Sequence, residues 1–183
     1  FIGTQIIDED SSLTLNLSAD DPEGDNVSYS FEVTNGSGVL EGSQLVITPD
    51  NNFNGDMELT VTVTDGMLED SELVLINVLP VNDAPDALLI NNTEINENEE
   101  FSLSLSATDI DSDSFFFSVL VDGNASAFVS DDVLYITPFS GFNGDIDVTV
   151  FVSDGYLSSE TNFTLTVIPV NDPPILSFIG TQI

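Results

Sequence analysis

The sequence repeats itself at an interval of 88 or 89 residues, and this duplication limits the folds that the chain can adopt. Val81-Asn82-Asp83-Ala84-Pro85 returns as Val170-Asn171-Asp172-Pro173-Pro174. Phe53-Asn54-Gly55-Asp56 also returns 89 positions later, whereas Glu9 matches Glu97 at an interval of 88. One residue inserted between the third strand and Leu134 of the second copy accounts for the difference. The pattern predicts tandem domains of one fold.

The end of the chain repeats its beginning. Phe178 to Ile183 has the same six residues as Phe1 to Ile6. We therefore expect one repeat over 1–84, a second over 85–174, and the opening strand of a third repeat over 175–183. This arrangement leads us to expect that the chain is a segment of a longer tandem array.

Within each repeat, apolar residues alternate with polar ones, which is typical of strands that bury one face. Clusters of Gly, Asn, Asp and Pro separate the alternating runs. About seven short strands per ~90 residues are typical of an immunoglobulin-like sandwich. We therefore predict an all-β chain of two Greek-key β-sandwiches, with most of the Phe side chains in the cores. The alternating apolar residues of the first repeat are Leu13, Leu15, Leu17, Ala19, Tyr29, Phe31, Val33, Leu45, Ile47, Met57, Leu59, Val61, Val63, Val74, Ile76 and Val78.

The charge of the chain is extreme in one direction. It has 33 acidic residues and no Lys, Arg or His, so its formal net charge is −33, yet 41% of its residues are hydrophobic. This apolar content favours folded cores over disorder. The charge argues against binding to nucleic acid, and the absence of a long apolar run argues against membrane insertion. Because no internal cation can pair with the acids, they either spread into solvent or converge on cations from outside.

The acidic residues recur at four matched stations: near Glu9 and Glu97, in the turns at Asp20–Asp25 and Asp109–Asp113, at the strand ends Asp65 and Asp154, and in the segments after the repeats. Alternating carboxylates such as Asp109, Asp111 and Asp113 suit Ca²⁺, which takes 6–8 oxygen ligands. Zinc and copper favour His or Cys, which the chain lacks. Asp and Gly are also ordinary turn residues, so solvated acidic turns remain the alternative.

In this order, Val63-Thr64-Asp65-Gly66, Val81-Asn82-Asp83-Ala84-Pro85 and Ala107-Thr108-Asp109-Ile110-Asp111 resemble the motifs of bacterial cadherin-like tandem repeats. The resemblance implies cadherin-like sandwiches with Ca²⁺ bound between successive domains. It implies a complete junction formed by Glu9, Asn82, Asp83, Asp109, Asp111, Asp154 and, as an additional ligand, Asp113. It also implies two half-sites, formed by Asp21, Asp25 and Asp65 and by Glu97, Asn171 and Asp172.

The chain departs from animal cadherins at two places. Pro80 and Val81 stand where the animal linkers begin with an acidic ligand, and the acidic Leu-Asp-Arg-Glu motif is missing. We therefore expect fewer Ca²⁺ ions at each junction.

Three classes of function are compatible with this composition. The first is a calcium-stiffened spacer in a large bacterial adhesin on the cell surface or outside the cell, where neighbouring repeats of the same chain are the partners. The second is a calcium-dependent recognition module that binds polysaccharide or mediates homophilic cell–cell adhesion. The third, an enzyme with paired carboxylates, is disfavoured because the acids are duplicated and cluster at linkers. We expect no catalytic activity.

Overall fold

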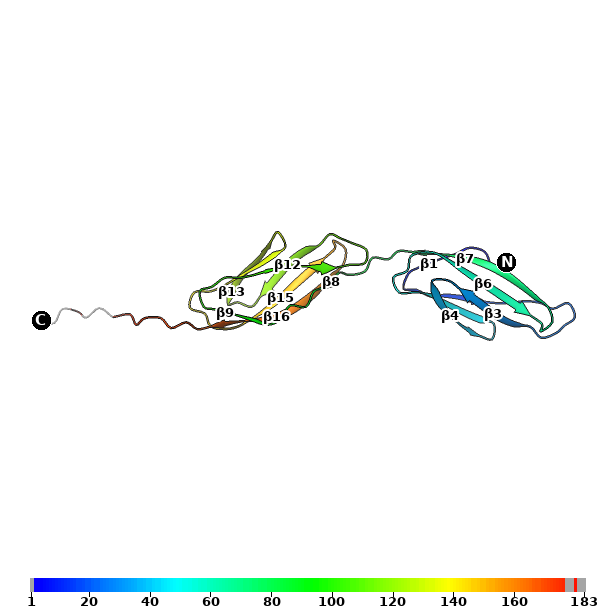
Figure 1. Cartoon of the computed structure of the whole chain (residues 1–183), viewed down its shortest axis with the longest axis horizontal. Coiled ribbons are helices and arrows are strands. Elements are labelled where there is room, and N and C mark those ends of the chain that lie inside the picture. Colours follow the sequence, from blue (N-terminus) through cyan, green and yellow to red (C-terminus); the bar gives the residue numbers. More distant parts are fainter. Residues whose placement is uncertain (1, 177–179, 181–183) are drawn as a thin grey trace. The chain divides into compact units, whose positions relative to one another are not determined.

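The computed structural model describes residues 2–176 and 180, and the chain divides into two compact units, Phe1–Val81 and Asn82–Ile183 (Figure 1). Every regular element of the described residues is a β-strand. The same part of the chain contains no helix that could span a membrane.

Unit 1 is a sandwich of two sheets with the strand orders β1-β7-β6-β3 and β2-β5-β4. β1 runs parallel to β7, and the other neighbouring strands are antiparallel. The strands are β1 (Gln5–Asp8), β2 (Leu13–Asn16), β3 (Ser28–Val33), β4 (Gly36–Glu41), β5 (Gln44–Pro49), β6 (Gly55–Thr64) and β7 (Glu69–Leu79).

Unit 2 repeats this topology, with the strand orders β9-β16-β15-β12 and β10-β14-β13. It adds a short antiparallel pair, β8 and β11, at one edge of the sandwich. The strands are β8 (Asp86–Ala87), β9 (Thr93–Asn96), β10 (Phe101–Ser104), β11 (Ala107–Thr108), β12 (Phe116–Val121), β13 (Ala125–Ser130), β14 (Val133–Pro138), β15 (Gly144–Ser153) and β16 (Ser158–Ile168).

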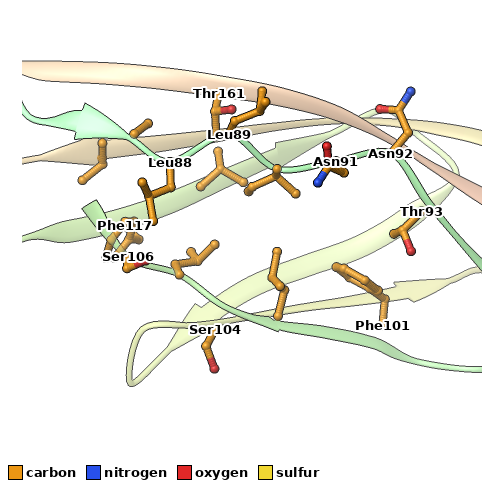
Figure 2. A pocket seen from close by; sticks show the side chains of 16 residues that line it. Leu88, Leu89, Asn91, Asn92, Thr93, Phe101, Ser104, Ser106, Phe117 and Thr161 are labelled. Atoms are coloured by element: carbon orange, nitrogen blue, oxygen red, sulfur yellow. The ribbon is translucent and has the colours of Figure 1, made fainter. Parts of the chain in front are cut away.

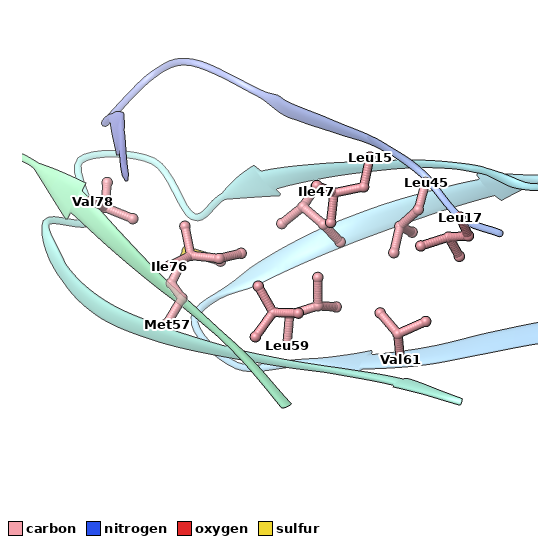
Figure 3. Packing of buried hydrophobic residues seen from close by; sticks show 10 residues of the cluster. Leu15, Leu17, Leu45, Ile47, Met57, Leu59, Val61, Ile76 and Val78 are labelled. Atoms are coloured by element: carbon pink, nitrogen blue, oxygen red, sulfur yellow. The ribbon is translucent and has the colours of Figure 1, made fainter. Parts of the chain in front are cut away.

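The core of each unit lies between its two sheets, because alternate side chains of every long strand point inward. In unit 1, Leu45, Ile47, Met57, Leu59 and Ile76 are completely buried (Figure 3). The equivalent positions of unit 2 hold a second cluster around Leu134, Ile136, Ile146 and Leu165. The prediction of two all-β sandwiches, made from the alternation, is confirmed.

The change of interval from 88 to 89 residues occurs in one turn. β3 and β4 are joined by Thr34–Asn35, whereas β12 and β13 are joined by three residues, 122–124. Strands before this turn correspond at an interval of 88 residues, and strands after it at 89. Insertion at a surface turn shifts the numbering and leaves both sheets intact.

Three details of the structure bear on the sequence prediction. β4 and β13 were not predicted, because their inward positions hold small residues such as Gly36, Gly38 and Ala125. Most of the described Phe side chains are buried or half-buried, as predicted, and Phe116, Phe128 and Phe139 are the exposed exceptions. The predicted opening strand of a third repeat over 175–183 lies largely outside the described residues.

Candidate functional site

The candidate site is built around the end of β15, where Asp154 follows the last strand residue. Asp154 is only 9% exposed. Its Oδ1 accepts hydrogen bonds from the backbone N–H groups of Tyr156 and Leu157, both at 2.7 Å. Gly155 makes this tight turn possible with a φ of 100°, a region that side chains rarely adopt. These bonds hold the Asp154 carboxylate in place through Oδ1 and leave Oδ2 free of the turn.

Asp154 Oδ2 binds the linker segment. It accepts a hydrogen bond of 2.7 Å from Nδ2 of Asn82. The backbone N–H of Tyr156 and the side-chain amide of Asn82 are the two largest causes that lower the pKa of Asp154 below that of an ordinary aspartate. Asp154 is therefore an anion at neutral pH.

Asp109 begins the acidic turn that faces the same segment. Its Oδ1 accepts the backbone N–H groups of Asp111 at 2.7 Å and of Ser112 at 3.0 Å. Its Oδ2 is buried and has no hydrogen-bond partner among the described residues. A buried carboxylate oxygen without a donor is costly, because it has lost its water and gained nothing in exchange.

Asp83 and Asp111 complete the group. Asp111 Oδ2 accepts the backbone N–H of Asp83 at 2.9 Å, and Asp83 Oδ2 is buried. The amide nitrogen of Asn82 also donates to the backbone oxygen of Asp83 at 2.7 Å. Two oxygens, from Asp83 and Asp154, thus converge on one N–H₂ group. All of these residues belong to unit 2.

The carboxylates of this group are linked through hydrogen bonds from backbone N–H groups and from the side-chain amide of Asn82. Among the described residues, no three acidic side chains are grouped closely enough to hold a metal ion by themselves. Asp113, the outermost residue of the alternating run, is exposed. The structure thus brings together Asn82, Asp83, Asp109, Asp111 and Asp154 and leaves Asp113 at the surface.

Glu9 was predicted to belong to the same junction, and its position is defined within unit 1. It is 3% exposed, and its Oε1 accepts the backbone N–H of Val81 at 2.6 Å. Its Oε2 accepts Nδ2 of Asn54 at 3.4 Å. Glu97 does the same in unit 2, where its Oε1 accepts the N–H of Val170 at 2.6 Å. Sequence reasoning missed this anchoring role, and the recurrence of the Glu was its only signal.

The predicted half-sites repeat part of this local geometry. Asp65 Oδ1 accepts the N–H groups of Met67 and Leu68, both at 2.7 Å, and these bonds lower the pKa of Asp65. Asp21 Oδ1 accepts the N–H groups of Glu23 and Asp25, both at 2.9 Å. At the other end of the chain, Nδ2 of Asn171 donates to the oxygen of Asp172 at 3.4 Å, as Asn82 donates to Asp83.

A family model described as "Bacterial Ig domain" matches the chain twice, over residues 2–77 and 82–167. Among curated proteins, the chain is 29% identical to "Integrin beta-like protein A" of Dictyostelium discoideum over 94% of its own length and 11% of that protein. It is 24% identical to "Chitinase A" of Pseudoalteromonas piscicida over 85% of its length and 20% of that protein. The chain therefore spans only a small part of both relatives.

Two solved structures share the fold. The crystal structure of human protocadherin-24 EC1-2 matches with a TM-score of 0.54 and 16% identity, covering 94% of this chain and 96% of that one. Drosophila N-cadherin EC1-4 matches with a TM-score of 0.50 and 17% identity, covering 90% of this chain and 47% of that one. At these identities the likeness concerns the fold alone.

Proposed function

The chain belongs to the bacterial Ig domain family, with two cadherin-like sandwiches in tandem, and we propose that it is a calcium-stiffened spacer of a larger extracellular or cell-surface bacterial adhesin. In this role the sandwiches have no catalytic activity, and their partners are Ca²⁺ and the neighbouring repeats. The observation that carries the proposal is the buried Asp109 Oδ2, which no donor in the described part of the chain reaches.

The oxygen atoms of this group are of the type that a hard cation prefers. Carboxylates of Asp83, Asp109, Asp111 and Asp154 lie on segments that contact one another, and the chain has no cation of its own to neutralise them. Ca²⁺ accepts 6–8 oxygen ligands in flexible geometry, and waters can complete the set. Asn82 would have to present its amide oxygen, because an amide nitrogen does not ligate Ca²⁺. Bound Ca²⁺ supplies the positive charge that the group lacks.

The stiffening follows from how consecutive residues are anchored. Val81 is held by Glu9, which belongs to unit 1, and Asn82 is held by Asp154, which belongs to unit 2. Calcium bound to Asn82, Asp109 and Asp154 would fix the second anchor more firmly. Little free linker would then remain between the units, so their relative rotation would be restricted.

Calorimetric titration of the calcium-free chain tests the binding step. We expect a Kd of about 10⁻⁴–10⁻³ M, the range of extracellular modules. Asp109→Asn keeps the Oδ1 hydrogen bonds and replaces the buried oxygen with N–H₂, so it should weaken binding at least about ten-fold. Asp21→Asn, the equivalent change in unit 1, is the matched control and should leave this site intact. Equal affinities of all three proteins would contradict the proposed site.

Spin-label distances test the stiffening step. The chain has no cysteine, so single labels can be placed at Val39→Cys in unit 1 and Phe128→Cys in unit 2, both exposed. Calcium should narrow the distribution of distances between these labels, and Asp109→Asn should prevent the narrowing. A distribution that calcium leaves unchanged, in a chain that binds calcium by calorimetry, would reject the spacer role and retain the site.

Polysaccharide recognition is a second candidate, favoured by an aromatic pair in which Phe128 is exposed and Tyr135 is half-buried. Phe128 and Tyr135 on β13 and β14 stack with ring centroids 5.0 Å apart and an interplanar angle of 17°. One of the relatives is named a chitinase. Retention of the chain on insoluble chitin, abolished by Phe128→Ala, would support this function. Absence of retention in the presence of Ca²⁺ would reject it for chitin.

A further inference from the structure

The outer face of the four-stranded sheet of unit 1 carries a row of exposed apolar side chains. Leu73 and Leu75 on β7 are 55% and 47% exposed, and Ile6 on the neighbouring strand β1 is 67% exposed. Leu79, at the end of β7, is exposed as well. We call these four residues the apolar strip. Contiguous apolar groups of this kind often mark an interaction surface on a soluble domain.

Carboxylates lie on both sides of the apolar strip. Glu58 on β6 is the cross-strand partner of Leu75, and Asp8 on β1 is the partner of Leu79. Asp56 precedes Glu58 by two residues and therefore lies on the same face of β6. All three acids are exposed. Because cross-strand partners have Cβ atoms about 5 Å apart, one binding partner can contact the apolar and the acidic side chains together.

A hollow of ≈ 700 Å³ lies beside the apolar strip. Its lining includes Leu75, Asp56, Glu58 and Asn77, so apolar and anionic groups border the same space. Nδ2 of Asn77 donates a hydrogen bond of 3.0 Å to Oδ1 of Asp56, which orients this carboxylate. The hollow thus has the mixed chemistry that an amphipathic partner requires.

The hollow between the sheets of unit 2 has a different chemistry. Its volume is ≈ 370 Å³, and Figure 2 shows Leu88, Leu89 and Phe101 around it. None of the described residues that line it is charged. This hollow therefore provides no electrostatic basis for selecting a partner.

Unit 2 retains the acids of the outer face and replaces three of the four strip residues with polar ones. The positions of the two leucines and the isoleucine hold Asn162, Thr164 and Glu94, and Asp145 and Asp147 retain the two acids. Asn162 and Glu94 are exposed in unit 2, where the segment before β9 is described. That segment leaves the outer face open, so the exposure of the strip in unit 1 does not depend on what precedes the unit.

We infer that this outer face of unit 1 binds a basic amphipathic helix of a partner protein. The face of a sheet presents side chains only, because the backbone groups pair within the sheet. A helix about 10 Å wide covers two strands that lie about 4.8 Å apart. Its apolar side chains lie on the apolar strip, and Lys or Arg side chains beside them pair with Asp56 and Glu58.

Charge selects a basic partner over a second copy of this chain. The chain has a formal net charge of −33 and no Lys or Arg. A second copy would therefore bring further carboxylates against Asp56 and Glu58. A basic helix is instead attracted by the field of the whole chain, and the apolar strip determines where it stays bound.

Binding of a synthetic peptide tests this inference. The probe is a helix-forming peptide of about 14 residues, made of Leu and Lys with the Leu residues on one face. A permuted peptide of the same composition without an apolar face is the control, and both are titrated by calorimetry in about 0.15 M NaCl. The amphipathic peptide should bind at least about ten-fold more tightly than the permuted one. Equal affinities would show attraction by charge alone and would overturn the inference.

Substitution of the apolar strip tests its role. Leu73→Asn combined with Leu75→Thr installs the residues of unit 2 and should weaken binding of the amphipathic peptide at least about ten-fold. Val39→Thr removes an exposed apolar side chain from β4, in the other sheet, and should change the affinity little. Equal losses in the two variants would overturn the inference. Self-association of the chain that the double variant abolishes, without any binding of the peptide, would overturn it in favour of a second copy.

Charge removal and NMR test the location. Glu58→Gln should weaken binding of the amphipathic peptide more than Glu41→Gln, which removes the same charge from β4. Amide chemical shifts in the intact chain should change mainly on β6 and β7 when the peptide is added. Changes centred on β15 and β16, the equivalent strands of unit 2, would overturn the assignment to unit 1.

Discussion

At the residue scale, the strand-end aspartates divide their two oxygens between two tasks. Asp65 and Asp154 each use Oδ1 to hold two backbone N–H groups of the following turn. Asp154 also accepts a hydrogen bond from Nδ2 of Asn82 through Oδ2. The Asp side chain is short enough to accept hydrogen bonds from the backbone N–H groups two and three residues later in the chain. The same side chain therefore serves the turn and the linker.

This arrangement predicts a pH dependence for Asp154→Ala in the calcium-free chain. The folded-state pKa of Asp154 is lowered, so its stabilising contribution is complete above the ordinary aspartate pKa and is lost as the pH falls through the lowered value. The variant should be less stable than the parent at neutral pH. This difference should shrink below about pH 4. Chemical denaturation across this range measures it, and a difference that grew in acid would contradict the assignment. Asp65→Ala should behave in the same way in unit 1.

A pair of small residues gives a second prediction with an internal control. A Cβ atom added to Gly36 would lie 2.6 Å from the backbone oxygen of Thr48 and 2.7 Å from Cε of Met57. The equivalent residue of unit 2 is Ala125, which is buried and accommodated. Gly36→Ala should therefore destabilise unit 1 by about 1–3 kcal/mol through overpacking.

The reverse change, Ala125→Gly, should destabilise unit 2 by about 1–2 kcal/mol, because it removes a buried methyl group and frees the unfolded backbone. Hydrogen exchange resolved by unit distinguishes the two effects. Stabilisation of unit 1 by Gly36→Ala would show that the space at this position is larger than the structure indicates.

At the element scale, the turn between β13 and β14 carries local strain. Asp131 and Asp132 have φ values of 49° and 59°, which are the left-handed values of a type I′ turn. The second position of this turn favours Gly. Asp132→Gly should therefore stabilise unit 2 by about 0.5–1 kcal/mol, and it also separates two adjacent negative charges.

The equivalent turn of unit 1 supplies the opposite control. Gly42 occupies the position of Asp131 with a φ of 62°, so Gly42→Ala should lower the free energy of unfolding by about 1 kcal/mol. Urea denaturation followed separately in the two units measures both changes. Destabilisation by Asp132→Gly would mean that the Asp132 side chain makes a contribution larger than the backbone strain.

The elements also show what the sequence could predict. Strands such as β6 and β15 could be predicted because large apolar residues occupy their inward positions. In β6 these residues include Met57, Leu59 and Val61. β4 could not be predicted in this way, because its inward Gly36 and Gly38 give no apolar signal, although the facing strands leave no room for larger residues. β8 has only two residues, and its strand character comes from its partner β11. Short elements of this kind depend on tertiary pairing, which periodicity cannot report.

The candidate site was predictable to a similar degree. The recurrence of the acids and the resemblance together selected Asn82, Asp109 and Asp154, which the structure links through hydrogen bonds. The local role of Glu9 was not predictable, since no pattern says which backbone N–H a carboxylate will accept. The calcium that these residues were selected to bind stays a prediction.

At the scale of the whole molecule, the net charge of −33 opposes folding and association alike. The distance over which exposed charges repel is about 10 Å at 0.1 M salt and about 3 Å at 1 M. Two cation effects should therefore be separable. Screening depends on ionic strength alone, whereas binding at Asp109 and its neighbours depends on the identity of the cation.

Thermal unfolding in matched salts tests this separation. The Tm of the calcium-free chain should rise steadily with NaCl. CaCl₂ at about 10 mM and equal ionic strength should add a further increase that grows with the logarithm of the Ca²⁺ concentration, because about 1.4–2.7 kcal/mol of stabilisation accrues at about 10–100 times the Kd. Asp109→Asn should retain the NaCl response and lose the calcium increment, whereas Asp21→Asn should keep the increment from the unit 2 site. If MgCl₂ and CaCl₂ gave the same increment in the parent and in Asp109→Asn, screening by a divalent ion would explain the stabilisation. The buried Oδ2 of Asp109 would then contribute nothing as a ligand.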